Sequence, residues 1–461
     1  MKRTLADFAK ACGGRLEGPD REYTAVSTDT RTIQAGELFV ALQGPRFNAN
    51  EFVTAAHKAK AAAAVVDSQQ SVPLTQIIVS NTQEALASAS KAWRSQFKIP
   101  LVGVAGSNGK TTVKEMLASI LSQAGNTLAT RGNLNNHIGV PLTLFRLDAA
   151  NRFAVVEIGT NHAGEVADLV KIATPDIGII TNAGAEHLEG FGSIEGVARA
   201  EGEMVEGLAP TATAVINADD AFTDLWRGLT KARVVTFGIE KPADFSAKNV
   251  RNEIVSSGFL TRFKLSSPLG EADIDLQLAG KHNIVNALGA AAAAAAAGAS
   301  LQNIAAGLAA VRAVKGRLQF KVARNGAWII DDSYNANPSS VRAGIDVLAG
   351  FDGRKWLVIG DMGELGAFAE SSHAEVGIYA REHGIERLFA TGSLTGLTVE
   401  SFGNGGQWFA DTQALARALD AEGSADVRML IKGSRVNRLE RVIEALVAPS
   451  IHSSTATGKT G

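Results

Sequence analysis

The chain is poor in cysteine and has no excess of charge of one sign. A single cysteine, Cys12, stands among 461 residues, which excludes an internal disulfide and indicates a reducing compartment. We expect Cys12 to be a small buried apolar residue. Basic and acidic residues number 45 and 47, and neither a basic stripe nor a polybasic run occurs. The sequence therefore predicts no nucleic-acid partner and no membrane-surface partner.

Long mixed hydrophobic runs are also missing. The first seven residues lack the apolar segment of a signal peptide. Residues 290–297 are all alanine and follow the polar residues His282, Asn283 and Asn286, so they predict a buried helix rather than a membrane span. We expect a cytoplasmic protein without membrane insertion.

Alternating strand and helix patterns divide the chain into three α/β blocks, because 461 residues are too many for one core. The predicted limits are 1–82, 83–314 and 315–449, with a Ser/Thr/Gly-rich tail over 450–461 that we expect to be disordered.

Apolar runs of strand length mark the sheets. In the second block they stand at 153–158, 177–180, 213–216 and 234–237, separated by helical patterns. Such spacing predicts a parallel sheet with helices on both faces. Residues 245–278 alternate polar and apolar and predict an antiparallel appendage. The third block repeats the α/β pattern and is predicted to be Rossmann-like, with strands at 327–330, 355–359, 387–390 and 428–431.

A glycine-rich turn joins the apolar run 101–105 to a helical pattern. Glycines let backbone N–H groups approach phosphate oxygens, a lysine adds charge, and a threonine hydroxyl can hold Mg²⁺. The full P-loop spacing is not met, because position 104 is valine, and an incidental turn is the alternative. The candidate phosphate ligands are Gly106, Ser107, Asn108, Gly109, Lys110, Thr111 and Thr112.

Polar residues stand where other predicted strands end, the edge at which open α/β sheets bind ligands. Glu157 interrupts an apolar strand, and His187 follows the strand at 177–180. With Thr111 they predict a Mg²⁺ site beside nucleotide phosphates. Residues 132–141 are rich in asparagine and fit either turn chemistry or a ligand loop. Three strand ends of the third block, at 331–338, 360–366 and 432–435, predict an active-site rim.

These motifs together resemble the Mur ligase family, the ATP-dependent amide-forming enzymes of peptidoglycan precursor synthesis. The resemblance covers nearly the whole chain in order. The shared segments are 105–112, 157–159, 182–187, 280–286 and 315–317. The segments 332–338, 360–366 and 432–440 are similar to those of the D-alanyl-D-alanine-adding members. Segments 27–31 and 36–42 resemble the UDP-binding domain shared with the diamino-acid-adding ligase, whose Asp-Asn-Pro-Arg signature is absent.

The resemblance implies an activity and its residues. The implied reaction joins D-alanyl-D-alanine to the terminal carboxylate of UDP-N-acetylmuramoyl-tripeptide through an acyl phosphate, in a monomer that uses ATP and Mg²⁺. Implied catalytic residues are Lys110, Glu157, His187 and Arg317. Lys110 and the loop amides hold the ATP phosphates, Thr111 and Glu157 hold Mg²⁺, and His187 holds a second Mg²⁺. Asn283 and Asn286 lie at the adenine, Arg317 at the γ-phosphate and Asp332 at the ribose. The implied substrate-binding residues are Ser27, Arg31, Asn135, Asn136, Tyr334, Asn335, Asn337, Lys432 and Arg435.

Two positions depart from the family pattern. Glu201 stands where the family usually has a lysine carbamylated by CO₂. A carbamate and a glutamate carry the same charge, so our hypothesis is that Glu201 replaces the carbamate near the second Mg²⁺. The alternative is an exposed helix carboxylate. Asn48-Ala-Asn-Glu-Phe52 replaces the usual Asp-Gly-His-Asp-Phe, which leaves the details of the UDP-sugar pocket open.

Two other functions remain open at this point. A folylpolyglutamate-type ligase shares the ATPase core, but the first block and the segment 334–338 argue against it. A non-catalytic nucleotide switch would not need so many polar loops at strand ends. No residue indicates whether the third amino acid of the tripeptide is lysine or diaminopimelate.

Overall fold

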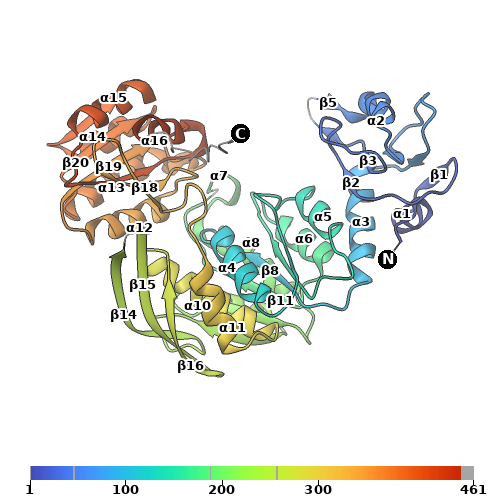
Figure 1. Cartoon of the computed structure of the whole chain (residues 1–461), viewed down its shortest axis with the longest axis horizontal. Helices are drawn as coiled ribbons and strands as arrows, with labels where there is room; N and C mark the ends of the chain where they lie inside the picture. The colour runs from blue at the N-terminus through green and yellow to red at the C-terminus, as the bar shows by residue number, and fades with distance from the viewer. Residues whose placement is uncertain (1, 45–46, 187, 256–257, 448–461) are drawn as a thin grey trace, which may run out of the picture.

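The computed structural model describes residues 2–44, 47–186, 188–255 and 258–447. Two predictions, for His187 and for the tail at 450–461, lie outside these residues. The described elements form three α/β groups, as expected. Figure 1 shows the N-terminal group (blue) and the C-terminal group (orange to red) on opposite sides of the central one.

The N-terminal group has a five-stranded sheet in the order β1-β7-β6-β3-β2. The strands are β1 (Arg15–Glu17), β2 (Val26–Ser27), β3 (Leu38–Val40), β6 (Ala63–Val66) and β7 (Gln76–Ile78). Only the β1–β7 pair is antiparallel. The short strands β4 (Gln43–Gly44) and β5 (Phe47–Asn48) pair separately. The helical elements are α1 (Leu5–Cys12), η1 (Ala49–Phe52) and α2 (Val53–Lys58). Cys12 is half-buried at the end of α1, rather than buried as expected.

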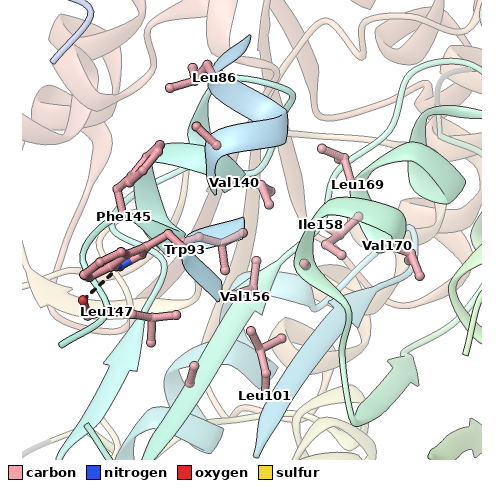
Figure 2. Packing of buried hydrophobic residues seen from close by; sticks show 14 of the residues in the cluster. Leu86, Trp93, Leu101, Val140, Phe145, Leu147, Val156, Ile158, Leu169 and Val170 are labelled. Atoms are coloured by element: carbon pink, nitrogen blue, oxygen red, sulfur yellow. Dashed lines mark hydrogen bonds between the residues drawn. The ribbon is translucent and has the colours of Figure 1, made fainter. Parts of the chain in front are cut away.

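Helix α3 (Thr82–Ser95) leads from the first group into the second, and the Asn81 side chain caps its first turn. Its buried face packs on the central sheet and on α5 (Gly139–Leu144) and α6 (Glu165–Ala173), as Figure 2 shows. The Trp93 indole donates a 3.2 Å hydrogen bond to the carbonyl of Leu147. Because the N–H group of this large buried ring has a hydrogen-bond partner, the ring fixes the orientation of α3 on the central group.

The central sheet is wholly parallel, with the order β13-β12-β11-β8-β10-β9. The strands are β8 (Leu101–Ala105), β9 (Thr127–Ala129), β10 (Phe153–Glu157), β11 (Ile177–Ile180), β12 (Thr213–Asn217) and β13 (Arg233–Phe237). The helices, besides α5 and α6, are α4 (Lys110–Ser122), α7 (Leu188–Phe191), α8 (Ile194–Glu206), α9 (Thr223–Leu229), α10 (Lys281–Ala296) and α11 (Leu301–Ala310). The alanines at 290–294 of α10 are buried against α4 and the sheet, which confirms the buried-helix prediction for this part of the run, whereas Ala296 is exposed. Within the residues that the structure covers, no helix combines the length and the apolarity needed to cross a bilayer.

An antiparallel appendage of β14 (Ser246–Val255), β15 (Gly258–Ser267) and β16 (Gly270–Leu276) leaves the central group, as predicted. The C-terminal sheet has the order β17-β18-β22-β19-β20-β21, with only the edge strand β17 antiparallel. Its strands are β17 (Gln319–Val322), β18 (Trp328–Asp332), β19 (Arg354–Gly360), β20 (Arg387–Thr391), β21 (Gly406–Phe409) and β22 (Val427–Lys432). The helical elements are α12 (Pro338–Ala349), η2 (Gly366–Phe368), α13 (Ala369–Glu382), α14 (Thr395–Phe402), α15 (Thr412–Glu422), η3 (Arg435–Asn437) and α16 (Glu440–Leu446).

Candidate active site

The phosphate loop, residues 106–109, lies at the carboxyl end of β8, between β10 and β11. Gly106 has φ 121° and Gly109 has φ 85°, conformations that L side chains rarely adopt. A Cβ atom on Gly106 would lie 2.1 Å from the Thr181 hydroxyl, and one on Gly109 would lie 2.5 Å from the Asn286 amide oxygen. Both glycines are therefore required by conformation and by space.

The end of β11 holds this loop in place. The Asn182 side chain accepts from the backbone N–H of Asn108 at 3.0 Å and donates to its carbonyl at 2.9 Å. The Thr181 hydroxyl donates to the same carbonyl at 2.6 Å. The Ser107 hydroxyl accepts from the N–H of Gly184 at 2.9 Å. The loop is thus fixed before a ligand arrives, which reduces the ordering cost of binding.

Lys110, the first residue of α4, folds back over this loop. Its ammonium donates to the carbonyls of Gly106 at 2.5 Å and Ser107 at 2.9 Å, and lies 3.9 Å from the Glu186 carboxylate. Burial alone would lower the pKa of Lys110. The nearby carboxylates of Glu186, Glu201 and, more weakly, Glu157 outweigh that effect, so the pKa is raised above its ordinary value. Lys110 is therefore a fixed positive charge at the loop.

Glu157 ends β10 and is only 2% exposed. Its Oε1 accepts from the Asn135 amide at 2.9 Å and the Thr111 hydroxyl at 3.3 Å, whereas its Oε2 is buried without a hydrogen-bond partner. A buried carboxylate oxygen without a partner is costly unless a cation binds it. Thr111 and Glu157 thus fit a hard cation such as Mg²⁺. Among the described residues, no three His, Cys, Asp or Glu side chains form a metal cluster.

Glu201 lies on α8 and is 3% exposed, so its interpretation as an exposed helix carboxylate is wrong. Its Oε2 accepts from the N–H of Gly106 at 2.6 Å. Burial raises the pKa of Glu201 to about 7, although Lys110 and the Gly106 amide lower it. The structure therefore places this carboxylate against the phosphate loop, a contact that the sequence did not predict.

A cavity of about 360 Å³ opens on one side of the loop, beneath α10. The predicted adenine residues Asn283 and Asn286 line it, and both are largely buried. The Asn283 amide donates to the carbonyl of Ala279 at 2.7 Å. Burial lowers the pKa of the adjacent His282, which favours the neutral form of its imidazole. Adenine is flat and mostly apolar with polar edges, and a nucleotide base of this kind suits such a lining.

A second, more polar cavity of about 380 Å³ lies on the other side of the loop. The asparagine-rich segment contributes Asn135 and Asn136 to its wall. The Asn136 side chain accepts from the N–H groups of Ile138 and Gly139 at the start of α5, so turn chemistry and cavity lining coexist there. The two cavities share residues of the central and C-terminal groups, namely Asn108, Gly109, Arg317, Asp332, Ser340 and Lys432.

Strand ends of the C-terminal group complete these walls. Lys432 ends β22 and donates to the Asp332 carboxylate at 2.6 Å and the Asn335 carbonyl at 2.9 Å. The other oxygen of Asp332 accepts from the N–H of Leu318 at 3.2 Å. Charge-assisted bonds of this kind hold the loops after β18 and β22 together.

Two guanidinium groups meet one aromatic ring at this edge. Arg317 lies 4.4 Å and Arg435 5.3 Å from the centre of the Tyr334 ring. Arg317 also donates to the Thr111 hydroxyl at 3.4 Å, which brings it to the phosphate loop across 206 residues of sequence. Cation–π contacts of this type orient arginines while leaving their N–H groups free for anions.

Ser27 and Arg31 are not part of this assembly. Both lie in the N-terminal group, and the cavities described above are lined without them. The Arg31 guanidinium pairs with Asp29 and lowers the pKa of that carboxyl to about 2. The segment 48–52, which departs from the family pattern, contains η1, and the Asn48 side chain caps this element by accepting from the N–H of Asn50. The structure therefore keeps the predicted UDP-sugar residues apart from the phosphate loop.

Some contacts at the site involve residues to which the sequence assigned no role. Asn182 supports the loop, and Ser339 of α12 reaches it from the C-terminal group. The sequence could have indicated a role for Asn182, because this residue stands directly after a predicted strand. It could not have indicated a role for Ser339, because its partner Asn108 is 231 residues away in sequence.

Comparison with known proteins gives matches over most of the chain. The model of the Mur ligase middle domain matches residues 104–294, and that of the "Mur ligase, glutamate ligase domain" matches residues 316–435. The UDP-N-acetylmuramoyl-tripeptide–D-alanyl-D-alanine ligase of Escherichia coli strain K12 is 43% identical, over 96% of this chain and 98% of its own length.

Solved structures agree. MurF from Acinetobacter baumannii superposes with a TM-score of 0.90 at 33% identity, over 96% of this chain and 98% of that one. The MurF ligase of Thermotoga maritima in complex with ADP superposes with a TM-score of 0.82 at 26% identity, over 91% and 96%. With full-length matches in sequence and structure, the chain belongs to the Mur ligase family.

Proposed function

We propose that this chain joins D-alanyl-D-alanine to the terminal carboxylate of UDP-N-acetylmuramoyl-tripeptide in peptidoglycan precursor synthesis. It is an ATP-dependent, amide-bond-forming ligase. The observation that carries the proposal is the meeting of Lys110, Arg317 and Lys432 around two cavities that share six lining residues. The E. coli relative, named for this reaction, is 43% identical over nearly its whole length.

The reaction needs two steps. A carboxylate oxygen of the tripeptide attacks the γ-phosphorus of ATP, the bond from that phosphorus to the β,γ-bridging oxygen breaks, and ADP leaves. The amine of D-alanyl-D-alanine then attacks the acyl carbon, loses a proton and expels phosphate. Lys110 and Arg317 neutralise charge in the first step, where two anions must approach each other. The C-terminal loops around Asp332 and Lys432 cover the site and exclude water from the acyl phosphate.

Mg²⁺ belongs to this proposal as a cofactor. Thr111 and Glu157 would hold it, and it would supply charge neutralisation beside the transferred phosphate. We propose His187 as a ligand of a second Mg²⁺, with Glu201 as the fixed anion that replaces the family's carbamate. Glu201→Lys tests that replacement. If the hypothesis holds, the lysine variant acquires a dependence on bicarbonate that the parent enzyme lacks. Equal activity of the variant with and without bicarbonate counts against it.

The remaining assignments follow from the same layout. We propose that residues 1–82 bind the UDP-sugar through Ser27 and Arg31, that 83–314 bind ATP, and that 315–449 close over it. Tyr334, Asn335, Asn337 and Arg435 would contact the substrates at the closing edge, together with Asn135 and Asn136. We also propose a monomer that works in the cytoplasm, where ATP and its nucleotide-linked substrate occur.

An ADP-release assay tests the function. We expect turnover only when both UDP-N-acetylmuramoyl-tripeptide and D-alanyl-D-alanine are present. ADP release with a folate and glutamate would indicate a folylpolyglutamate-type ligase, and nucleotide binding without substrate-dependent turnover would indicate a switch. The same assay with lysine and diaminopimelate tripeptides identifies the preferred third residue.

A further inference from the structure

We propose that Asn108 is a positioning residue that couples the phosphate loop to docking of the C-terminal group on the nucleotide site. Its amide oxygen accepts from the Asn337 side chain at 2.9 Å, and its amide nitrogen donates to the Ser339 hydroxyl at 3.1 Å. Both partners stand at the start of α12. The inference rests on the proposed ATP-dependent function, because it assigns the loop to ATP phosphates.

The loop side of this contact is rigid. The backbone N–H and carbonyl of Asn108 are both bonded to Asn182, and its carbonyl also accepts from Thr181. The residue stands between the two left-handed glycines, Gly106 and Gly109. Its side chain therefore projects from a fixed backbone, and its position reports the position of the loop.

The helix side is equally well ordered. Asn337 is the N-cap of α12, and its side chain accepts from the N–H of Ser340 at 2.8 Å, within a capping box. The Ser339 hydroxyl donates to the Asn337 side chain at 3.0 Å. Pro338 occupies the first helical position. The link thus joins two preorganised elements, and it forms only when α12 sits on the loop.

A second contact between the central and C-terminal groups is apolar. Phe259 of the appendage is 7% exposed, and its ring centre lies 5.7 Å from that of Phe320 and 5.4 Å from that of Phe351. Burying such rings contributes more free energy than two hydrogen bonds between neutral groups. The C-terminal group therefore rotates about the aromatic contact, and the hydrogen bonds of Asn108 to α12 are the ones that break when this group moves away from the phosphate loop.

The chemistry of position 108 suits this role. An asparagine amide can donate and accept at once, which the two partners on α12 require. Asn108 also lines both cavities, so a bound nucleotide and the C-terminal group act on the same residue. Nucleotide binding and closure are then thermodynamically coupled, and each strengthens the other.

Three variants test the coupling, namely Asn108→Ala, Ser339→Ala and the double variant. Ser339 is exposed, so its truncation leaves the fold intact. Asn325→Ala is the matched control, because that half-buried asparagine bonds only within the C-terminal group. Since Cys12 is the only cysteine, a Cys12→Ser background accepts spin labels at the exposed positions Glu195 and Glu400.

We expect Ser339→Ala to lower kcat about fivefold, the effect of one neutral hydrogen bond, and Asn108→Ala to lower it about 25-fold, because that variant loses both bonds to α12. The double variant should be no worse than Asn108→Ala, because Asn108→Ala already removes the bond to Ser339. When a non-hydrolysable ATP analogue binds the parent, the distribution of distances between the two spin labels should narrow to one closed population. The distributions of the Asn108 and Ser339 variants should stay broad. Asn325→Ala should match the parent both in kcat and in its distance distribution.

Two results would overturn the inference. One is multiplicative losses in the double variant, which would mean that the two residues act separately. The other is a reduced rate with unchanged nucleotide-induced closure, which would assign Asn108 to phosphate binding alone. A parent enzyme that closes on the analogue but shows no substrate-dependent ADP release would refute the proposed function and leave the coupling standing.

Discussion

Replacing Glu201 with glutamine separates the two things that this side chain supplies, a hydrogen-bond acceptor and a charge. The carboxylate accepts from the N–H of Gly106 at 2.6 Å in a buried site, and a glutamine amide oxygen can still do so. What the variant loses is the negative charge beside Lys110. We expect turnover at pH 8 to fall about tenfold, because a charge-assisted bond exceeds a neutral one by roughly 1–1.5 kcal/mol.

The same substitution changes how stability depends on pH. Burial raises the folded-state pKa of Glu201 from 4.5 to about 7. An acid with a raised folded-state pKa contributes stability that is fully present below pH 4.5 and is lost as the pH rises through 7. One pKa unit corresponds to about 1.36 kcal/mol, so the parent should lose about 2.5 kcal/mol relative to Glu201→Gln between pH 5 and pH 8.

Denaturant unfolding of the metal-free, nucleotide-free protein measures this difference by tryptophan fluorescence. Trp226 is a suitable local reporter, because its indole donates to the carbonyl of Ala198 on α8 at 2.8 Å. The control is Glu206→Gln, which changes an exposed carboxylate at the end of the same helix. A difference between the parent and Glu201→Gln that stays constant from pH 5 to pH 8 would refute the reasoning.

Three further changes test the site. Lys110→Ala should lower kcat by roughly 10²–10³ while the melting temperature holds, because it removes one preorganised charge at the phosphates; near-normal ADP release would contradict the loop assignment. Gly109→Ala should weaken ATP binding in calorimetry, because its Cβ would lie 2.5 Å from the Asn286 amide, and unchanged affinity would show that the loop can shift. Lys432→Met should destabilise the fold by about 3 kcal/mol in unfolding experiments by leaving the half-buried Asp332 without its cation, and adding Asp332→Asn should restore much of that loss.

Much of the architecture could be predicted from local pattern. The strands at 177–180 and 213–217 fall where the apolar runs placed them, because buried parallel strands are nearly continuous in apolar residues. Short or edge strands such as β2 and β21 gave no comparable signal, since they are held by neighbours rather than by their own composition. The phosphate loop was visible because its glycines, lysine and threonines are contiguous.

Contacts between residues far apart in the sequence were not predictable in the same way. The burial of Glu201 against Gly106, the meeting of Arg317 with Thr111, and the link from Asn108 to α12 each join residues about 90 or more positions apart. No local pattern encodes such pairs, because they depend on how finished sheets and helices pack. The sequence by itself determined the main buried strands, the phosphate loop and the family. Only the tertiary structure decided which carboxylate supports the loop and which residues join its two sides, since charge, burial and hydrogen bonding arise when the groups meet.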